Sequence, residues 1–584
     1  MVIGQLIVFR GTNPVILGMD LWMVISDLLQ IIFGNVMRLK SILIILIFFP
    51  ILISAQLKFI VEDFEGFADG SSDLKPNGLF VFGNTKAKID IHPEHALNYA
   101  GDRFIKLENG GKLDYGGWGK GMGANVELDV KLDYLNFYVY QPAANGATIF
   151  KIELQEDDNG SNVYEKEQDD SWTFIQTLDK KNNWELISIP LINFKDANKG
   201  GDGVFNISYK DGKLFCFIVS FMEDSKGQAV SRTAKTWNFD FVCFSKGKLP
   251  IGQGLFNPIM SNSNEFCNLG AWSKEGNTAN FTDIPTSFEN NFKPAADKKL
   301  AVVHLFQPFA VDGGNTQNFY PSVDRIKKII QQGYIPLITL EDHFVNAHPG
   351  MKQPNLYSIV EGHFDSFFAD WAKQIKEVEG IVLLRILHEF NGDWYPWCIA
   401  NNDKDPKLLI KAFRHIRDIF KAQNVSNVKF IWCPNSMSFP QEKWNFIMDA
   451  YPGDEYVDFV ALDIYNGAGK ELPVWRSFRK EGIENYFVLT QHLPQKPLFI
   501  CEVASRERKA TESALAQNKA EWINQMSEAL SSDMSKIKLL TWFNEKETFK
   551  INSSQKAKEA FLNSVMKKDY FQSGTKSMFV ILRP

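Results

Sequence analysis

Two glutamates, Glu389 and Glu502, each end an apolar run and are the residues best placed by type to do chemistry. The first closes "IVLLRILHE" and the second lies in "PLFICEVAS". Two carboxyl groups held close together can divide a reaction, since one donates a proton while the other attacks or activates water. The sequence shows no Ser/His/Asp order, no cluster of His and Cys ligands and no P-loop. It therefore predicts chemistry by carboxyl groups, without a metal or another cofactor.

Aromatic residues surround the first of these glutamates. "HEFNGDWYPW" places His388, Trp394 and Trp397 within ten residues, together with Asn391 and Asp393. Sugars present C–H faces that stack on indole rings and hydroxyl groups that bond to polar side chains. A carboxyl pair among aromatic rings is typical of glycoside hydrolysis.

The elements that position these residues follow a regular rhythm from about residue 260. Short apolar runs alternate with long amphipathic segments, which predicts a parallel β/α architecture. The spacing predicts eight strands, at 266–272, 300–306, 335–341, 381–389, 428–435, 459–466, 497–505 and 538–545. Eight such units favour a (β/α)8 TIM barrel, in which catalytic groups lie at the carboxyl ends of the strands.

Most of the predicted strands do end in polar or aromatic groups. Period two places Arg385 on the same side as Glu389, beneath it, where it could orient a carboxylate. Tyr465 can donate its hydroxyl to a neighbouring carboxylate. Glu341 ends its strand near a neighbouring subsite or forms a loop ion pair, and Trp432 either lines the site or packs against helices. Cys501 is expected to point away from the barrel axis.

"RILHEFNGDWYPW", "FVALDIYN", "PLFICEVAS" and "LLTWFNEKE" together resemble glycoside hydrolase family 26, over roughly residues 257–570. The resemblance implies a retaining endo-glycanase with Glu389 as acid/base and Glu502 as nucleophile. It further implies that His388 and Tyr465 assist them and that Trp394 and Trp542 build sugar-binding walls. We expect Arg385, Trp397, Glu341 and Trp432 to belong to the same substrate site.

The resemblance leaves the substrate open among several β-glycans. β-1,4-Mannan is the first expectation, and mixed-linkage β-1,3-1,4-glucan or xylan is the alternative. A different class of function is a polysaccharide-binding surface protein without catalysis, which would keep the tryptophans but would not need both glutamates.

Residues 57–248 form a separate strand-rich region. Runs such as "YLNFYVYQ" and "TIFKIELQ" alternate at period two between Gly, Asn and Asp clusters, which predicts an antiparallel β-sandwich. Its outward residues, among them Tyr138 and Glu153, either line a sugar-binding face or form a solvated surface. The region resembles jelly-roll carbohydrate-binding modules, and that resemblance makes Glu62, Asp63 and Asp240 candidates for a structural calcium site.

The remaining segments bear on localisation. Residues 37–55 read as a signal peptide, with a basic start, a short apolar core and a small-residue cleavage site, so residues 1–36 are expected to be an over-called extension. The rival interpretation makes residues 1–55 a membrane anchor. Residues 249–258 are predicted to be a linker, 259–570 the barrel and 571–584 a tail without an assigned role.

Composition excludes some partners. Hydrophobic residues make up 45% and the formal net charge is −6, which fits a folded protein and gives no basic footprint for nucleic acid. The six cysteines have no CxxC spacing, so buried free thiols are expected for most of them. We expect a monomer that is secreted, periplasmic or at the cell surface. Its expected partner is a polysaccharide, and no membrane partner is expected after signal cleavage.

Overall fold

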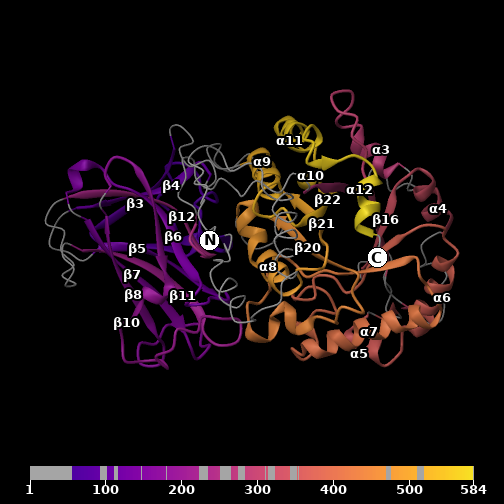
Figure 1. The fold of residues 1–584 in the computed structure, drawn as a ribbon, viewed down its shortest axis with the longest axis horizontal. Helices are drawn as coiled ribbons and strands as arrows, with labels where there is room; N and C mark the ends of the chain where they lie inside the picture. The colour runs from indigo at the N-terminus through magenta and orange to yellow at the C-terminus, as the bar shows by residue number, and fades with distance from the viewer. Residues whose placement is uncertain are drawn as a thin grey trace, which may run out of the picture. The chain divides into compact units, whose positions relative to one another are not determined.

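The computed structural model describes most of the chain after residue 54, and Figure 1 shows it as a ribbon. The described residues are 55–92, 101–110, 116–146, 148–178, 180–222, 234–249, 265–273, 283–308, 311–312, 323–341, 351–352, 354–467, 475–508 and 518–582. The predicted signal peptide and most of the predicted linker lie outside them. Within these ranges, no helix is long and apolar enough to span a membrane.

The N-terminal region is a β-sandwich of two antiparallel sheets, as the alternating pattern predicts. One sheet has the order β3-β4-β12-β6-β9, with β1 on β12, and the other has the order β10-β8-β7-β11-β5-β2. The strands are β1 (Gln56–Glu62), β2 (Leu79–Gly83), β3 (Thr85–Ile91), β4 (Arg103–Asn109), β5 (Gly116–Ala124), β6 (Asp133–Tyr140), β7 (Thr148–Asp157), β8 (Ser171–Leu178), β9 (Trp184–Pro190), β10 (Lys195–Asp196), β11 (Lys213–Met222) and β12 (Lys235–Lys246).

The two faces of these strands differ in what covers them. Leu135, Phe137 and Val139 of β6 are buried in the cluster between the sheets, as their alternation predicts. Tyr138, on the opposite face, is only 5% exposed and belongs to the cluster that includes the barrel's helices. It therefore cannot form part of an open sugar-binding face. On the other sheet Glu153 is half-buried and bonds its neighbours Lys151 and Gln155.

The C-terminal region is a closed eight-stranded parallel barrel. Its order is β14-β16-β18-β19-β20-β21-β22-β13, and β13 also pairs with β14, which closes the ring. The strands are β13 (Cys267–Ser273), β14 (Val302–Pro308), β16 (Ile335–Glu341), β18 (Val382–Arg385), β19 (Val428–Trp432), β20 (Phe459–Asn466), β21 (Leu498–Ser505) and β22 (Ile537–Asn544). The predicted TIM barrel is thus confirmed.

Helices surround the barrel strands (Figure 1), and a short two-stranded ladder forms a separate sheet. The helices are α3 (Ile284–Glu289), α4 (Val323–Gln331), α5 (Leu356–Val360), α6 (Asp365–Lys376), α7 (Pro406–Ala422), α8 (Phe478–His492), α9 (Lys519–Leu530), α10 (Lys546–Phe549), α11 (Gln555–Phe561) and α12 (Lys576–Leu582), and the ladder joins β15 (Val311–Asp312) to β17 (Met351–Lys352).

Strand alternation divides the barrel core in two. Inward residues such as Leu337, Leu383 and Leu539 form one cluster, and outward residues pack on the helices in another. The tail belongs to this architecture, because β23 (Phe571–Gln572) pairs with β13 and Met578 of α12 joins the inner cluster. All six cysteines are buried and free, as expected.

Candidate active site

Glu389 lies just beyond β18, where the backbone leaves its regular strand geometry. Leu387 and Glu389 have φ values of 50° and 52°, in the left-handed region that L-residues rarely adopt. The Glu389 amide donates to the carbonyl of Cys433, beyond the next strand, at 2.8 Å. Strained backbone of this kind persists only where the surroundings fix it, and it concentrates at functional sites.

The carboxyl group of Glu389 is almost enclosed, with one specific donor. Trp394 Nε1 donates to Glu389 Oε2 at 2.7 Å. The Trp394 side chain is 43% exposed, whereas Glu389 is 8% exposed. Burial, and then the charge of Glu502, raise the pKa of Glu389 to about 7, against the opposing effect of the Trp394 hydrogen bond. Glu389 can therefore hold a proton near neutral pH.

Glu502 reaches the same place from β21 because the strand departs from period two. The pairing of β21 with β22 shifts register between Ile500 and Val503, and the pairing with β20 shifts at Asp463. As a result Cys501 lies in the inner barrel cluster, and Glu502 also contacts inward-facing groups. The prediction that Cys501 points outward is wrong, since it assumed unbroken alternation.

Arg385 links two buried carboxylates beneath the mouth of the barrel. Its Nη2 donates to Glu502 and its Nη1 to Asp463, and its side chain is fully buried. Tyr465 donates its hydroxyl to Glu502 Oε2 at 2.5 Å. The guanidinium compensates negative charge that would otherwise be costly in a buried position. Arg385 and Tyr465 thus both contact Glu502, as their predicted places on the strands imply.

A second layer holds the guanidinium in place. Arg385 Nε donates to Thr339 Oγ1 at 2.8 Å, and His304 Nε2 lies 2.8 Å from the same oxygen. Burial, and then the charge of Arg385, lower the pKa of His304 well below its usual value. A neutral His304 adds no second positive charge beside the guanidinium. Sequence reasoning did not find His304 or Thr339, although both lie on predicted strands.

The aromatic residues that follow Glu389 divide into exposed and buried members. Tyr395 and Trp397 stack with centroids 4.6 Å apart, and the His388 ring lies 4.6 Å from that of Tyr395. Trp397 Nε1 donates to the His388 carbonyl at 2.7 Å. Trp397 and His388 are nearly inaccessible. Both side chains lie behind Trp394 and are placed to position this segment of the chain, and their contact with substrate stays a prediction.

Glu341 ends β16 at the same end of the barrel and is half-buried. After burial, the charges of Glu389, Glu502 and Glu341, in that order, raise the pKa of Tyr395 well above its usual value. Glu341 therefore lies within electrostatic reach of the site.

Two predicted tryptophans face the helices instead of the site. Trp432 and Trp542 are each 1% exposed and belong to the helix-facing cluster. Trp542 Nε1 donates to the Phe549 carbonyl at 3.2 Å. Alternation along β22 gives the inward position to Phe543, whose ring lies 5.7 Å from that of Tyr465. The prediction that Trp432 and Trp542 contact substrate is wrong, because their places on the strands turn them outward.

The calcium candidates of the sandwich have other partners. Glu62 pairs with Lys120 and Lys480, each at 2.8 Å, and Asp63 accepts from Ser477. Asp240 pairs with His92 at 3.1 Å. Over the described ranges, these three acids do not form a group with metal-ligand spacing.

Comparison with known proteins agrees with this geometry. Residues 343–548 match the family model described as glycosyl hydrolase family 26, a range that contains Glu389, Trp394, Tyr465 and Glu502. The barrel therefore contains a glycosyl hydrolase family 26 region, over residues 343–548. The resemblance found in its motifs is thereby confirmed.

The curated relatives of this chain differ in the activities that their names state. The chain is 30% identical over 312 residues to Endoglucanase H of Acetivibrio thermocellus, which covers 52% of this chain and 31% of that protein. It is 32% identical over 108 residues to a mannan endo-1,4-beta-mannosidase of Bacillus subtilis, covering 17% of this chain and 28% of the other. The chain thus spans about a third of the length of these curated relatives.

Among solved structures, the Podospora anserina GH26-CBM35 beta-(1,4)-mannanase is 11% identical, with a TM-score of 0.38, and the match covers 85% of this chain and 98% of that one. A TM-score this low carries no argument about function.

Proposed function

We propose that the protein is a retaining endo-β-glycanase that hydrolyses a β-linked polysaccharide with Glu389 and Glu502. The observation that carries the proposal is the unequal treatment of two neighbouring acids. The pKa of Glu389 is raised to about 7, while Glu502 accepts hydrogen bonds from Arg385 and Tyr465. One acid is thus suited to give a proton and the other to act as a charged nucleophile.

The proposed reaction has two steps. Glu389 protonates the glycosidic oxygen while a Glu502 oxygen attacks the anomeric carbon, which breaks the C–O bond and forms a glycosyl ester on Glu502. Glu389, now ionised, then removes a proton from water. The water oxygen attacks the same carbon, releases Glu502 and restores the proton on Glu389. Trp394 suits this scheme because its exposed ring can stack on a sugar while its N–H orients Glu389.

β-1,4-Mannan is the first candidate substrate, because several relatives are named mannan endo-1,4-beta-mannosidases. A mixed-linkage β-glucan is the second candidate. It is supported by the relative aligned over 52% of this chain, which is named an endoglucanase. β-Xylan is the third candidate substrate and is included in the test below.

The test is release of reducing ends from mannan, mixed-linkage glucan and xylan. It uses the wild type, Glu389→Ala and a control, Glu379→Ala, whose exposed side chain lies between α6 and β18. We expect turnover of one polysaccharide by the wild type and the control, and a large loss in Glu389→Ala. Absence of product from mannan would remove the first candidate. Absence of product from all three would favour a non-catalytic binding protein.

The stereochemistry is tested separately by proton NMR of the first product. Double displacement gives a newly formed reducing end in the β configuration, which mutarotates only later. An α product would point to inversion and would refute the role given to Glu502.

We further propose that the protein is exported after cleavage of residues 37–55. The basis is the sequence pattern of that segment. Sequencing the N-terminus of protein from the native host tests this proposal. A start near Gln56 supports export, and a retained Met1 would contradict it.

A further inference from the structure

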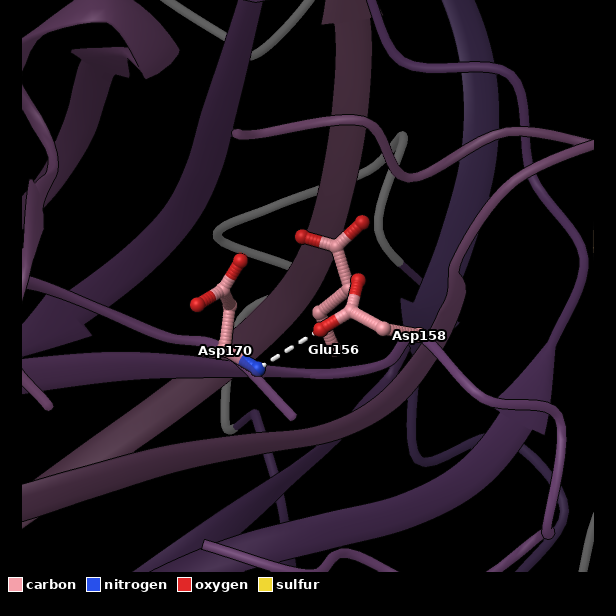
Figure 2. Close-up of side chains that lie close together, drawn as sticks. All are labelled: Glu156, Asp158 and Asp170. Carbon is pink, nitrogen blue, oxygen red and sulfur yellow. Dashed lines mark hydrogen bonds between the residues drawn. The ribbon is translucent and has the colours of Figure 1, made fainter. Parts of the chain in front are cut away.

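Three carboxyl groups of the sandwich converge at one end of a hairpin. Glu156 lies near the end of β7, Asp158 follows that strand, and Asp170 directly precedes β8. One oxygen from each lies within 4.8 Å of the others, and Figure 2 shows the three side chains gathered around a common space. Glu156 and Asp170 are fully buried, and Asp158 is half-buried.

Among the described residues, neutral groups donate the hydrogen bonds to these carboxylates. Trp172 Nε1 donates to Glu156 at 2.9 Å, and the amide of Gly203 donates to Asp170 Oδ2 at 3.0 Å. The Asp170 amide donates to Asp158 Oδ2 at 2.8 Å (Figure 2). Throughout the described part of the chain, no Lys, Arg or His forms an ion pair with any of the three.

The second carboxylate oxygens of Asp158 and Asp170 indicate that a ligand binds here. Oδ1 of Asp158 and Oδ1 of Asp170 are buried and, within the described residues, have no hydrogen-bond partner. A buried carboxylate oxygen without a partner is rare because it loses hydration without compensation. The Asp170 side chain is fully buried, so its Oδ1 is not exposed to bulk solvent.

Glycines leave room next to these oxygens. A β-carbon at Gly212 would lie 2.2 Å from Glu156 Oε1, and one at Gly201 would lie 2.2 Å from Asp170 Oδ1. Gly201 also has a φ of 68°. The backbone thus comes close to the carboxylates at both glycines.

We propose that Glu156, Asp158 and Asp170 bind a hard divalent cation of the calcium class. The donors are all oxygens, which excludes the thiolate and imidazole sets that favour zinc or copper. Calcium accepts six to eight oxygen ligands in irregular geometry, so backbone carbonyls and water can complete the shell. Magnesium demands a tighter octahedron and keeps most of its waters, which suits an enclosed group of three carboxylates less well.

The cation would join two segments that are distant in sequence. Glu156 and Asp170 close the β7–β8 hairpin, since the Glu156 amide donates to the Asp170 carbonyl at 2.9 Å. The amides of Gly203 and Asn206 bring the segment before β11 to the same carboxylates. A bound cation would therefore stabilise this end of the sandwich against unfolding.

The experiment uses the full chain, freed of metal by a chelator and dialysed, with CaCl2 added back. Wild type is compared with Asp158→Asn, Asp170→Asn and a control, Asp90→Asn, on β3 of the other sheet. Calorimetric titration counts bound Ca²⁺, and differential scanning calorimetry follows the sandwich transition. Tb³⁺ luminescence excited through Trp172, whose indole bonds Glu156, reports occupancy of this site.

We expect the wild type and the control to bind Ca²⁺ and to gain several degrees of melting temperature. Both site variants should lose one bound Ca²⁺ per chain and the Tb³⁺ signal. Without metal, Asp158→Asn should melt at or above the wild type, because it removes one of three repelling charges. If Asp170→Asn does not fold, the result for Asp158→Asn alone decides whether the proposed cation site exists. Wild type that binds no Ca²⁺ at millimolar concentration, or Asp158→Asn that binds like the wild type, overturns the proposal.

Discussion

The barrel and the sandwich each bury a group of carboxylates, but they treat the charge differently. At the barrel mouth Arg385 bonds both Glu502 and Asp463, and Tyr465 adds a neutral donor. In the sandwich, Glu156 and its two neighbours accept only from neutral groups and keep two oxygens without a partner among the described residues. The barrel carboxylates thus have the Arg385 guanidinium as their cation, whereas the sandwich carboxylates are proposed to bind a metal ion from solution.

The comparison shows that residue type alone does not assign a role to a buried acid. A carboxylate that accepts from a fixed guanidinium is held in one geometry, as a nucleophile requires. A carboxylate without such a partner either takes up a proton or binds a metal ion. The surroundings of each group therefore decide between the proposed catalysis and the proposed metal binding.

The largest expected effect separates the two regions by activity. Glu502→Ala should lower kcat on the preferred polysaccharide by about 10⁴-fold or more, because no covalent intermediate can form. Steady-state rates of reducing-end release measure this. Glu379→Ala serves as the matched control, and a loss in Glu502→Ala of less than tenfold would break the assignment of a nucleophile to the barrel.

The next effect compares the regions by stability. Arg385→Met leaves Glu502 and Asp463 buried without their common cation, which should destabilise the barrel by roughly 3–5 kcal/mol at pH 7. In metal-free protein, Asp158→Asn in the sandwich should have the opposite sign. Calorimetric melting of both variants measures this contrast.

Acidification provides the control for the arginine variant. Protonation of the two orphaned carboxylates removes the uncompensated charge, so the deficit of Arg385→Met should shrink between pH 7 and pH 4. A deficit that stays constant over this range would show that lost packing, and not charge, causes it.

The barrel and its site are the parts of the structure that the sequence predicts best. Period and spacing predict all eight barrel strands, and β16 and β20 match to the residue, because the barrel interior demands long apolar runs. Glu389, Glu502, Arg385 and Tyr465 come together as predicted, since parallel strands bring their carboxyl ends to one edge.

The failures arise where alternation is broken or where contact is long-range. The bulge near Cys501 cannot be read from composition, and Trp542 was given to the site although its neighbour Phe543 has the inward parity. Tyr138 is outward on its sheet, but sequence does not show that a second core covers that face. The sequence does not indicate the group of sandwich acids, because hairpin register, and not sequence spacing, joins Asp158 to Asp170.

A smaller effect tests the tuning of the proposed acid. Trp394→Phe keeps an apolar ring but removes the N–H that donates to Glu389 at 2.7 Å. A hydrogen bond to a charged group contributes ~1.5–3 kcal/mol, so kcat/KM should fall roughly ten- to a hundredfold. Because that bond lowers the pKa of Glu389, its loss should move the alkaline limb of the pH profile upward. Trp444→Phe, at a half-buried tryptophan elsewhere on the barrel, should change neither quantity.

A stability effect of similar size tests whether the surroundings of Glu389 hold it protonated. Its pKa is about 7 in the folded protein and ordinary when unfolded, so the folded state binds the extra proton between about pH 4.5 and pH 7. Stability from this group is therefore lost as pH rises through that window, and Glu389→Gln removes the loss. The variant should match the wild type near pH 4 and exceed it above pH 8 by at most about 3 kcal/mol. Calorimetric melting at both pH values measures the difference. A gap that does not depend on pH would mean that Glu389 titrates normally, and the barrel would then lack the asymmetry between its two acids on which the proposed mechanism depends.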